Sequence, residues 1–553
     1  MKAFRFVCAI TILVFAILMI VLVVAQSHPV AHGNQLNAIP ERQKLPAPAV
    51  AMQSPQLSFA KAVAYNSGGY DPDSVAVGDL NGDGIPDLVV ANCSSNNVTC
   101  ESSPTGEVDV LLGNGDGTFQ AAVGYGSGGY KALSIEIGDV NGDGYPDLVV
   151  ANYCQSGNCE SGGEASVLLG NGDGTFQPAL SYGSGGYYAE SVAVADFDGD
   201  GKLDLVVANY CETQACDNGS ASVLMGNGNG TFQAPVSYDS GGTQANSVVI
   251  SDLDGDGVPD LVVAQQCPTM DCDFGEVSVL LGNGDGTFRA PVTYSSGGYD
   301  AHSVAVGDVN GDGRPDLAVG NSCPSGSCSG GIVGVLLNNG DGTFQAPVTY
   351  STGGNVLESL AIGDINGDGL ADLVVANACE TIQKTGNCQT RPGWVSVLLG
   401  NSDGTFQTPV GYNSGGYGGV AVAIADLNGD GRPDLAVTNF YASKNHTTGS
   451  VGVLLNSFIA RTTIVVTSSP NPSQVNQTVT FTATIASTPA VPNGEIVTFY
   501  EGKTSLGTGA TTNGMASLTT SFSKAKTYTI KATYPGDAFH KASTGTVKQV
   551  VNP

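Results

Sequence analysis

The sequence predicts an all-β protein, a seven-bladed β-propeller followed by a small immunoglobulin-like β-sandwich. One unit of short apolar segments and turns recurs seven times, its segments are rich in β-branched residues, and the repeat ceases near Arg461. An acidic turn marks the period with spacings of 56 to 62 residues, and its first residues are Asp79, Asp139, Asp196, Asp252, Asp308, Asp364 and Asp426. This regularity excludes the disorder that 77 glycines would otherwise indicate.

The composition narrows the class of partner. Among 553 residues there are 50 acidic and 20 basic ones, which gives a formal net charge of -30. A chain this acidic is poorly suited to nucleic acid. We therefore expect carboxylates that gather around cations, and no nucleic-acid partner.

The N-terminal residues predict export. Lys2 and Arg5 precede an apolar run over residues 6–25, and Val23 and Ala25 are placed like a small-residue cleavage signal. The run is also long enough to span a bilayer, so residues 1–25 are interpreted as a signal peptide or a signal anchor. Residues 26–54 contain four prolines and no periodic pattern, and we interpret them as a linker.

Each unit contains four segments that are too short for helices. In the third unit they begin at Ser191, Leu205, Ala221 and Phe232, and four antiparallel strands make one blade. The last unit stops at Asn456 without its fourth strand, whereas residues 59–65 form an unassigned strand at the start. We expect this N-terminal strand to complete the last blade of a propeller over residues 55–458.

The segment 459–553 is predicted to be a separate sandwich domain. Its charge balance reverses, and apolar and polar residues alternate over residues 478–486, 495–500 and 528–534. This pattern fits an immunoglobulin-like fold without a disulfide.

The acidic turns have the donor pattern of calcium loops. In the first, oxygen-bearing side chains occupy positions 1, 3, 5 and 9, glycine occupies position 6, and a backbone carbonyl at position 7 adds a ligand. Hard oxygen donors favour Ca²⁺ over zinc or copper. The predicted ligands, up to seven Ca²⁺ in all, are Asp79, Asn81, Asp83, Ile85 and Asp87; Asp139, Asn141, Asp143, Tyr145 and Asp147; Asp196, Asp198, Asp200, Lys202 and Asp204; Asp252, Asp254, Asp256, Val258 and Asp260; Asp308, Asn310, Asp312, Arg314 and Asp316; Asp364, Asn366, Asp368, Leu370 and Asp372; and Asp426, Asn428, Asp430, Arg432 and Asp434.

Three other interpretations of these turns exist. An EF-hand needs Glu at position 12, where the first copy has Val90, and it needs flanking helices. The same flanks argue against a dockerin-like module. An Asx-type turn that binds no ion stays open as the simpler alternative.

A second turn, close to Gly-Asn-Gly-Asp-Gly-Thr-Phe, carries at most one Asp and is interpreted as a hairpin. The aromatic residues that end it are expected to pack between blades rather than to contact a ligand. They are Phe119, Phe176, Phe232, Phe288, Phe344 and Phe406.

Twelve cysteines fall in pairs at the same place in the first six units. In an exported chain they are interpreted as local disulfides, because two thiolates without a partner His or Cys make a poor metal site. The pairs are Cys93 and Cys100, Cys154 and Cys159, Cys211 and Cys216, Cys267 and Cys272, Cys323 and Cys328, and Cys379 and Cys388.

Alternating strand direction places the two kinds of turn on one face and the cysteine loops on the other, beside Ser-Gly-Gly-Tyr loops. The tyrosines of these loops are Tyr70, Tyr130, Tyr187, Tyr299 and Tyr417. We expect an exposed ring of tyrosines that is a platform for ligands, with simple cover for flexible glycines as the alternative.

The seven Asp-x-Asn/Asp-Gly-Asp-Gly-x-x-Asp turns resemble those of FG-GAP and VCBS repeat proteins, which include the integrin α-subunit propellers, over about residues 55 to 458. The resemblance implies calcium in turns on the lower face and ligands at the upper face. All seven turns are intact here, unlike in integrins, so the chain looks more like a bacterial relative and no integrin partner is implied. Residues 492–500 and 534–537 resemble bacterial immunoglobulin-like repeats of surface proteins.

Three functions are compatible with these features. The first is binding or adhesion, in secreted form or at the cell surface, to an extracellular protein or glycan, with membrane contact only through a retained leader. The second is a carbohydrate-active enzyme, which would need Glu136, Glu190 or Glu276, because the five histidines follow no motif. The third is a structural matrix component. We favour binding without catalysis.

Overall fold

The computed structural model describes residues 57–94, 105–157, 159–267, 274–324, 330–380, 388, 391–444, 448–487 and 489–553. The apolar leader and the predicted linker lie outside this part of the chain. The regular elements are the strands β1 to β35, which confirms the all-β fold class. None of the described residues forms a helix that is long and apolar enough to cross a membrane.

Blades one to five are separate four-stranded antiparallel sheets. In chain order their strands are β2 (Tyr70–Gly78), β3 (Asp87–Cys93), β4 (Gly106–Leu111) and β5 (Val123–Gly126); β6 (Tyr130–Gly138), β7 (Asp147–Cys154), β8 (Glu164–Leu168) and β9 (Leu180–Gly183); β10 (Tyr187–Ala195), β11 (Asp204–Cys211), β12 (Ser220–Leu224) and β13 (Val236–Asp239); β14 (Thr243–Ser251), β15 (Asp260–Cys267), β16 (Glu276–Leu280) and β17 (Val292–Ser295); and β18 (Tyr299–Gly307), β19 (Asp316–Cys323), β20 (Ile332–Leu336) and β21 (Val348–Ser351). The expected four-strand unit is confirmed, although the fourth strand starts four residues after the phenylalanine, for example at Val236 in blade three.

Blades six and seven are joined in one seven-stranded sheet. It contains β22 (Gly354–Gly363), β23 (Asp372–Glu380), β24 (Pro392–Leu398), β25 (Val410–Ala425), β26 (Asp434–Tyr441), β27 (Ser450–Leu454) and β1 (Val63–Asn66). The sixteen-residue strand β25 is the outer strand of blade six and then the inner strand of blade seven.

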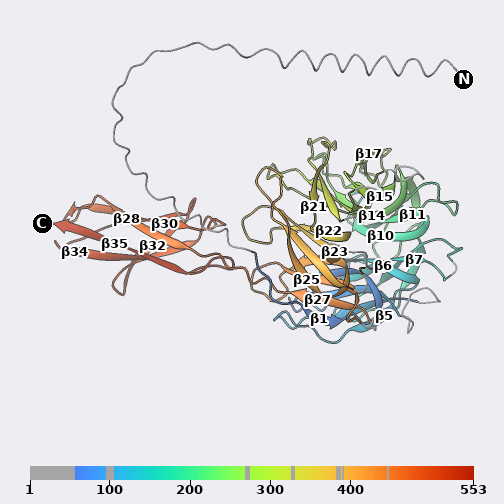
Figure 1. The fold of residues 1–553 in the computed structure, drawn as a ribbon, viewed down its shortest axis with the longest axis horizontal. Coiled ribbons are helices and arrows are strands. Elements are labelled where there is room, and N and C mark those ends of the chain that lie inside the picture. The colour runs from blue at the N-terminus through green and yellow to red at the C-terminus, as the bar shows by residue number, and fades with distance from the viewer. Residues whose placement is uncertain are drawn as a thin grey trace, which may run out of the picture. The chain divides into compact units, whose positions relative to one another are not determined.

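The N-terminal strand closes the ring. β1 pairs antiparallel with β27, from Val63 opposite Val453 to Asn66 opposite Ser450. Figure 1 shows β1, at the blue end of the described chain, beside the orange β27. This confirms the prediction that residues near the start complete the last blade, and closure leaves fewer unpaired sheet edges.

The second strand of each blade is the most buried because neighbouring blades cover both of its faces. In β11, Leu205, Val206, Val207 and Ala208 are fully buried. A continuous apolar run of this kind is what a strand covered on two sides requires.

A repeated aromatic pair lies between adjacent blades. The ring of Tyr182, from blade two, meets Phe232, from blade three, edge to face with centroids 5.6 Å apart. Equivalent pairs are Tyr65 with Phe119, Tyr125 with Phe176, Tyr238 with Phe288, Tyr294 with Phe344, and Tyr350 with Phe406. All six phenylalanines are buried, which confirms that they pack between blades.

We expect Phe232→Ala to lower the free energy of unfolding by about 3 to 5 kcal/mol, because it leaves a cavity between two blades. Phe274→Ala is the matched control, since Phe274 is 45% exposed and its loss should change stability by less than about 1 kcal/mol. Urea denaturation of both variants measures the difference. Equal effects would contradict the assigned packing role.

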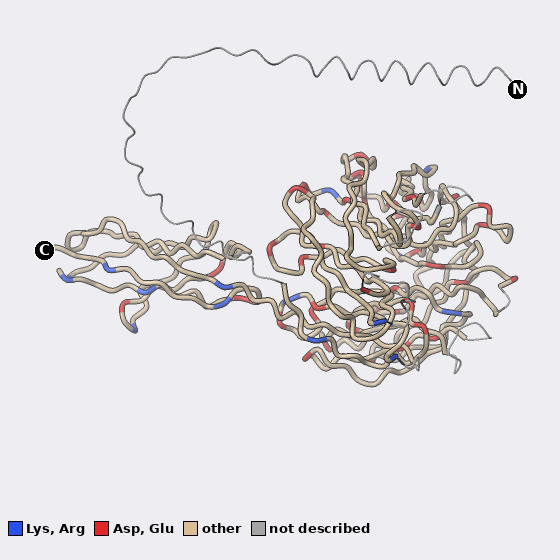
Figure 2. The backbone as a smooth tube through the Cα atoms, viewed as in Figure 1, with Lys and Arg blue, Asp and Glu red and all other residues tan. Residues whose placement is uncertain are grey.

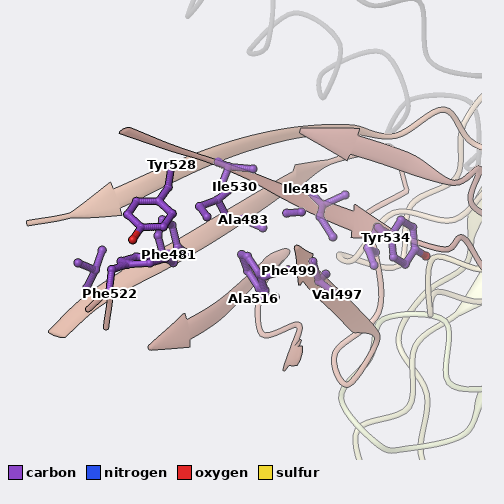
Figure 3. Packing of buried hydrophobic residues seen from close by; sticks show 14 of the residues in the cluster. Phe481, Ala483, Ile485, Val497, Phe499, Ala516, Phe522, Tyr528, Ile530 and Tyr534 are labelled. Atoms are coloured by element: carbon purple, nitrogen blue, oxygen red, sulfur yellow. The ribbon is translucent and has the colours of Figure 1, made fainter. Parts of the chain in front are cut away.

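The C-terminal residues form two sheets that pack face to face. One contains β28 (Thr463–Ser469), β30 (Thr478–Ala486) and β33 (Met515–Ser521), and the other contains β29 (Ser473–Gln474), β35 (Ser543–Asn552), β34 (Thr527–Tyr534), β31 (Ile496–Glu501) and β32 (Thr504–Ala510). Figure 3 shows Phe481, Phe499 and Tyr528 in the core between them. The three alternating segments expected from the sequence correspond to β30, β31 and β34 within one or two residues.

Charge is distributed as the composition indicates. Figure 2 shows Asp and Glu at many turns of the propeller, whereas Lys and Arg are the more frequent charged residues along the C-terminal sheets. The carboxylates thus belong mainly to the propeller, where many of them lie in the acidic turns.

Candidate functional site

The acidic turns share one geometry. In the first, Asp79 Oδ1 accepts hydrogen bonds from the backbone N–H groups of Gly82 (2.8 Å) and Asp83 (3.1 Å), and its Oδ2 accepts one from Gly84 (2.8 Å). Gly84 has a φ of 80°, and a Cβ there would meet no atom within 4 Å. The left-handed backbone, and not lack of space, therefore requires glycine at position 6.

The Asp at position 9 ties the acidic turn to the second turn. Asp87 is fully buried, its Oδ2 accepts from Leu80 N (2.9 Å) and its Oδ1 accepts from Gly113 N (2.7 Å). The other six blades repeat both bonds. Burial raises the pKa of these carboxyls, for example that of Asp372 to about 7.

The donors of two turns converge. Carboxylate oxygens of Asp196, Asp198 and Asp204 lie within 4.8 Å of one another, and those of Asp252, Asp254 and Asp260 do the same. These are the two turns with four aspartates. Oxygen donors at this spacing fit one hard cation such as Ca²⁺.

The five turns with Asn at position 3 keep the same arrangement. Asn81 Oδ1 accepts from Asp83 N at 2.9 Å, just as Asp198 Oδ1 accepts from Asp200 N at 3.1 Å. An amide oxygen thus replaces a carboxylate oxygen in the same place. These hydrogen bonds also close the turn, as in an Asx-type turn. A carboxylate oxygen has enough lone pairs to accept them and to bind a cation as well.

Three turns carry a cation at position 7, which sequence reasoning treated only as a carbonyl ligand. Lys202 Nζ lies 2.5 Å from Asp200 Oδ2, Arg314 Nη1 lies 3.7 Å from Asp312 Oδ2, and an Arg432 ion pair engages Asp430. The Lys202 ammonium holds the pKa of Asp200 below its usual range.

The second turns are hairpins, as expected. Gly113 forms a bridge with Phe119, and Asp116 Oδ1 accepts from Thr118 N (3.0 Å) and Thr118 Oγ1 (2.5 Å). Each single Asp is used in closing its own turn.

The structure contains disulfides between Cys154 and Cys159, between Cys211 and Cys216, and between Cys379 and Cys388, with Cα atoms 4.7 to 5.3 Å apart. Cys93 and Cys323 are disulfide-bonded as well, but Cys100 and Cys328 lie outside the described residues. The pairing of Cys267 with Cys272 stays a prediction for the same reason.

The register places the two sets of loops at opposite ends of the blades. Gly78 pairs with Asp87 at the acidic turn, whereas Tyr70 pairs with Cys93 at the other end of the same two strands. In the part of the chain that is described, all five tyrosines are half-buried, and their role as a platform for ligands stays a prediction. Each tyrosine begins or lies within an inner strand, and strand pairing half buries it.

A cavity of about 830 Å³ opens at the centre of the propeller, lined by the first strand of every blade. Tyr70 and Tyr130 line it, and the other three predicted tyrosines do not. One residue from each blade forms a ring around it, here called the variable ring: Asp73, Leu133, Glu190, Asn246, His302, Glu358 and Val420. Next to it lies a serine ring of Ser74, Ser134, Ser191, Ser247, Ser303 and Ser359, with Ala421 as the seventh member.

The serine ring links adjacent blades. Ser134 Oγ accepts from Val192 N (3.3 Å), and Ser191 Oγ accepts from Val248 N (3.2 Å) in the following blade. These hydrogen bonds between adjacent blades explain why serine recurs at this position.

The variable ring is acidic and electrostatically coupled. Lys131 Nζ lies 3.4 Å from Asp73 Oδ2 and 3.8 Å from Asp71 Oδ2. Burial, opposed by Lys131, raises the pKa of Asp73 to about 7 and that of Glu190 to about 7. Burial would lower the pKa of His302, but Glu358, Asp300 and Glu190 raise it overall.

Sequence reasoning missed most of this cavity. Of the three carboxylates considered for catalysis, Glu190 lines it and Glu136 and Glu276 do not. The available signal was the residue immediately before the repeated serine, which differs in nearly every unit.

Comparison with known families decides the membership of the chain. The FG-GAP-like repeat model matches residues 95–150, 154–207, 213–263, 268–319, 325–375 and 387–437, and the FG-GAP repeat model matches residues 72–111. The chain belongs to the FG-GAP repeat family. The Bacterial Ig-like domain (group 3) model matches residues 466–552, so the FG-GAP propeller is followed by a bacterial immunoglobulin-like domain.

The FG-GAP propeller is similar to integrin α subunits. It is 30% identical to mouse (Mus musculus) integrin alpha-IIb over 232 residues, which are 38% of this chain and 21% of the integrin. It is 28% identical to chicken (Gallus gallus) integrin alpha-V over 225 residues, again 38% and 21%. The chain thus spans about a fifth of the length of these relatives.

Among solved structures, a mutant of NanB sialidase from Streptococcus pneumoniae aligns with a TM-score of 0.38 and 11% identity, covering 72% of this chain and 70% of the sialidase. At that level of similarity it bears on neither the fold nor the function of the FG-GAP propeller.

Proposed function

We propose that this FG-GAP propeller is an exported calcium-binding protein that binds an extracellular protein or glycan on the face opposite its acidic turns. The observation that carries the proposal is the convergence of the Asp196, Asp198 and Asp204 oxygens within 4.8 Å, in a turn that recurs in all seven blades.

Calcium would be held by the side chains at positions 1, 3, 5 and 9 and by the carbonyl at position 7. When bound, it would neutralise the carboxylates that crowd each turn. The position-9 carboxylate also holds the second turn through a backbone bond, so an occupied turn would fix two loops of the blade together.

Location outside the cytoplasm is supported by three observations. The disulfides suit an oxidising compartment, the apolar run of residues 6–25 has the form of an export signal, and the relatives are integrin α subunits. We assign residues 1–25 to the leader, 26–54 to a linker, 55–458 to the propeller and 459–553 to the immunoglobulin-like domain.

The face with the cysteine loops is the better ligand surface. The acidic turns are occupied by their own hydrogen bonds and by the proposed ions, whereas the opposite end has an open cavity with aromatic and charged walls. We propose binding without catalysis.

To test the proposed face, arrays of glycans and matrix proteins are probed with the purified protein in calcium. We expect a retained ligand whose binding falls at least about tenfold in Tyr130→Ala, which alters the cavity face. Tyr145→Ala is the matched control, since Tyr145 is 48% exposed on an acidic turn. Binding that responds to Tyr145→Ala and not to Tyr130→Ala would place the ligand on the other face.

A further inference from the structure

The variable ring is formed by residues that leave the strand ladder. In β10 the pairing register shifts between Ala189 and Ser191, which makes Glu190 the extra residue of a β-bulge. Equivalent shifts occur at Leu133, Asn246, His302 and Glu358. A bulge redirects one side chain without disturbing the rest of the strand, and here it directs one side chain from each of these blades to the cavity.

The fold does not require charge at these positions. Leu133 and Val420 occupy the same place in blades two and seven, so an apolar side chain fits there. A carboxylate among protein atoms costs free energy unless something compensates it. Glu190 and Glu358, which have no such compensation in an ion pair, are therefore better explained by a ligand than by blade stability.

The charges of the cavity do not balance. Lys131 is paired with Asp71 and Asp73. In the described part of the chain, the side chains of Glu190 and Glu358 make no hydrogen bond or ion pair. Beside them, the buried Asp300 Oδ1 also lacks a hydrogen-bond partner among the described residues. Among the described residues that line the cavity, His302 is the one basic residue besides Lys131, so carboxylates outnumber basic groups there.

A single metal ion does not account for this arrangement. Among the described residues, no three carboxylate or imidazole donors of the cavity lie within 4.8 Å of one another, in contrast to those of the acidic turns. The carboxylates come from blades one, three and six, so they are spread around the ring. A ligand must be extended to reach more than one of them.

Aromatic rings complete the walls. Tyr153 lines the cavity and stacks on Tyr188 with centroids 4.7 Å apart. Phe440 and Tyr441 line it from blade seven. Aromatic faces next to carboxylates attract organic cations, whose alkyl parts also pack on the rings.

We propose that the central cavity binds an extended ligand with alkylammonium groups, either lysine side chains of a protein partner or a free polyamine. The inference rests on the proposed function and names the chemistry of its ligand. Ammonium groups would pair with Glu190 and Glu358, and their alkyl chains would lie against Tyr153, Phe440 and Tyr441.

The test is calorimetric titration of the purified protein with spermidine, in saturating calcium so that the acidic turns do not compete. We expect saturable binding that weakens about tenfold in Glu190→Gln or Glu358→Gln and further in the double variant. Glu276→Gln, on β16 outside the cavity, is the matched control and should bind normally. A peptide with glycine-spaced lysines, and its acetyllysine version, form the second arm, and the tighter probe identifies the source of the ammonium groups.

The pH dependence of spermidine binding to the unmodified protein gives a second readout. Asp73 and Glu190 have a pKa of about 7, set by burial together with Lys131, Asp71 and His302, so both gain protons as the pH falls. Glu358, whose pKa burial also raises, faces His302 and Asp300. Affinity for spermidine should therefore fall between pH 8 and pH 6.

The inference is overturned if neither probe saturates, or if the double variant binds as tightly as the Glu276→Gln control while it melts like the unmodified protein. Calcium-dependent melting, measured on the same samples, separates the two proposals. If calcium still stabilises the protein but no probe binds, only the ammonium site is wrong.

Discussion

Removal of calcium should lower the melting temperature of the propeller by about 20 °C or more. Each occupied site adds about 2.7 kcal/mol to the free energy of unfolding when free calcium is about 100 times the dissociation constant. The chain has seven acidic turns. In a domain of this size about 1 kcal/mol corresponds to about 2 °C, so even partial occupancy gives a large shift. Scanning calorimetry with calcium and with chelator measures it, and mass spectrometry of the dialysed protein should count close to seven ions.

Two substitutions in the third turn make this prediction specific. Asp196→Ala removes the position-1 carboxylate, which accepts from Gly199, Asp200 and Gly201, and should cost one ion. Asp198→Asn introduces the position-3 side chain that five other turns already have, so it should keep the ion. Absence of bound metal together with an unchanged melting temperature would leave the turns as Asx-type turns.

Loss of the first strand should abolish cooperative melting. A chain that starts at residue 57 keeps Leu57, which is 4% exposed, and Tyr65, whose ring is 5.5 Å from that of Phe119. A chain that starts at residue 67 loses both and leaves β27 as an open edge. Loss of the Leu57 and Tyr65 side chains alone should lower the free energy of unfolding by more than about 4 kcal/mol.

Thermal unfolding of the two truncated chains, followed by circular dichroism, tests this expectation. Tyr65→Ala in the longer chain should cost about 3 kcal/mol, whereas Val63→Ala, at a residue that is 55% exposed, should cost less than about 1 kcal/mol. If the chain that starts at residue 67 melts like the longer one, the ring does not depend on β1.

The propeller could be predicted because its determinants repeat. Seven copies of an acidic turn gave the blade period, and the absence of a fourth strand after Asn456 gave the closure by an N-terminal strand. The packing of Phe232 followed from its place after a turn. These features depend on local chemistry that is the same in every unit.

The cavity could not be predicted because it depends on backbone geometry that residue type does not reveal. Lys131, Tyr188 and Gln244 adopt φ angles of 56°, 60° and 62°, a left-handed region that non-glycine residues seldom enter. The following bulge breaks the alternation of faces on which strand reasoning depends. Glu190 was therefore considered only as one isolated carboxylate, and the half burial of the tyrosines was missed for the same reason.

The pairing of β1 with β27 also sets the order in which the protein can assemble. Val63 and Val453 are 390 residues apart in sequence, so the first strand leaves the ribosome long before its partner exists. At about 5 to 20 residues per second, synthesis of that interval takes roughly 20 to 80 s. Blades one to five can each form from neighbouring residues during this time. The seventh cannot, and its unpaired strands stay open to association with other chains until the ring is closed.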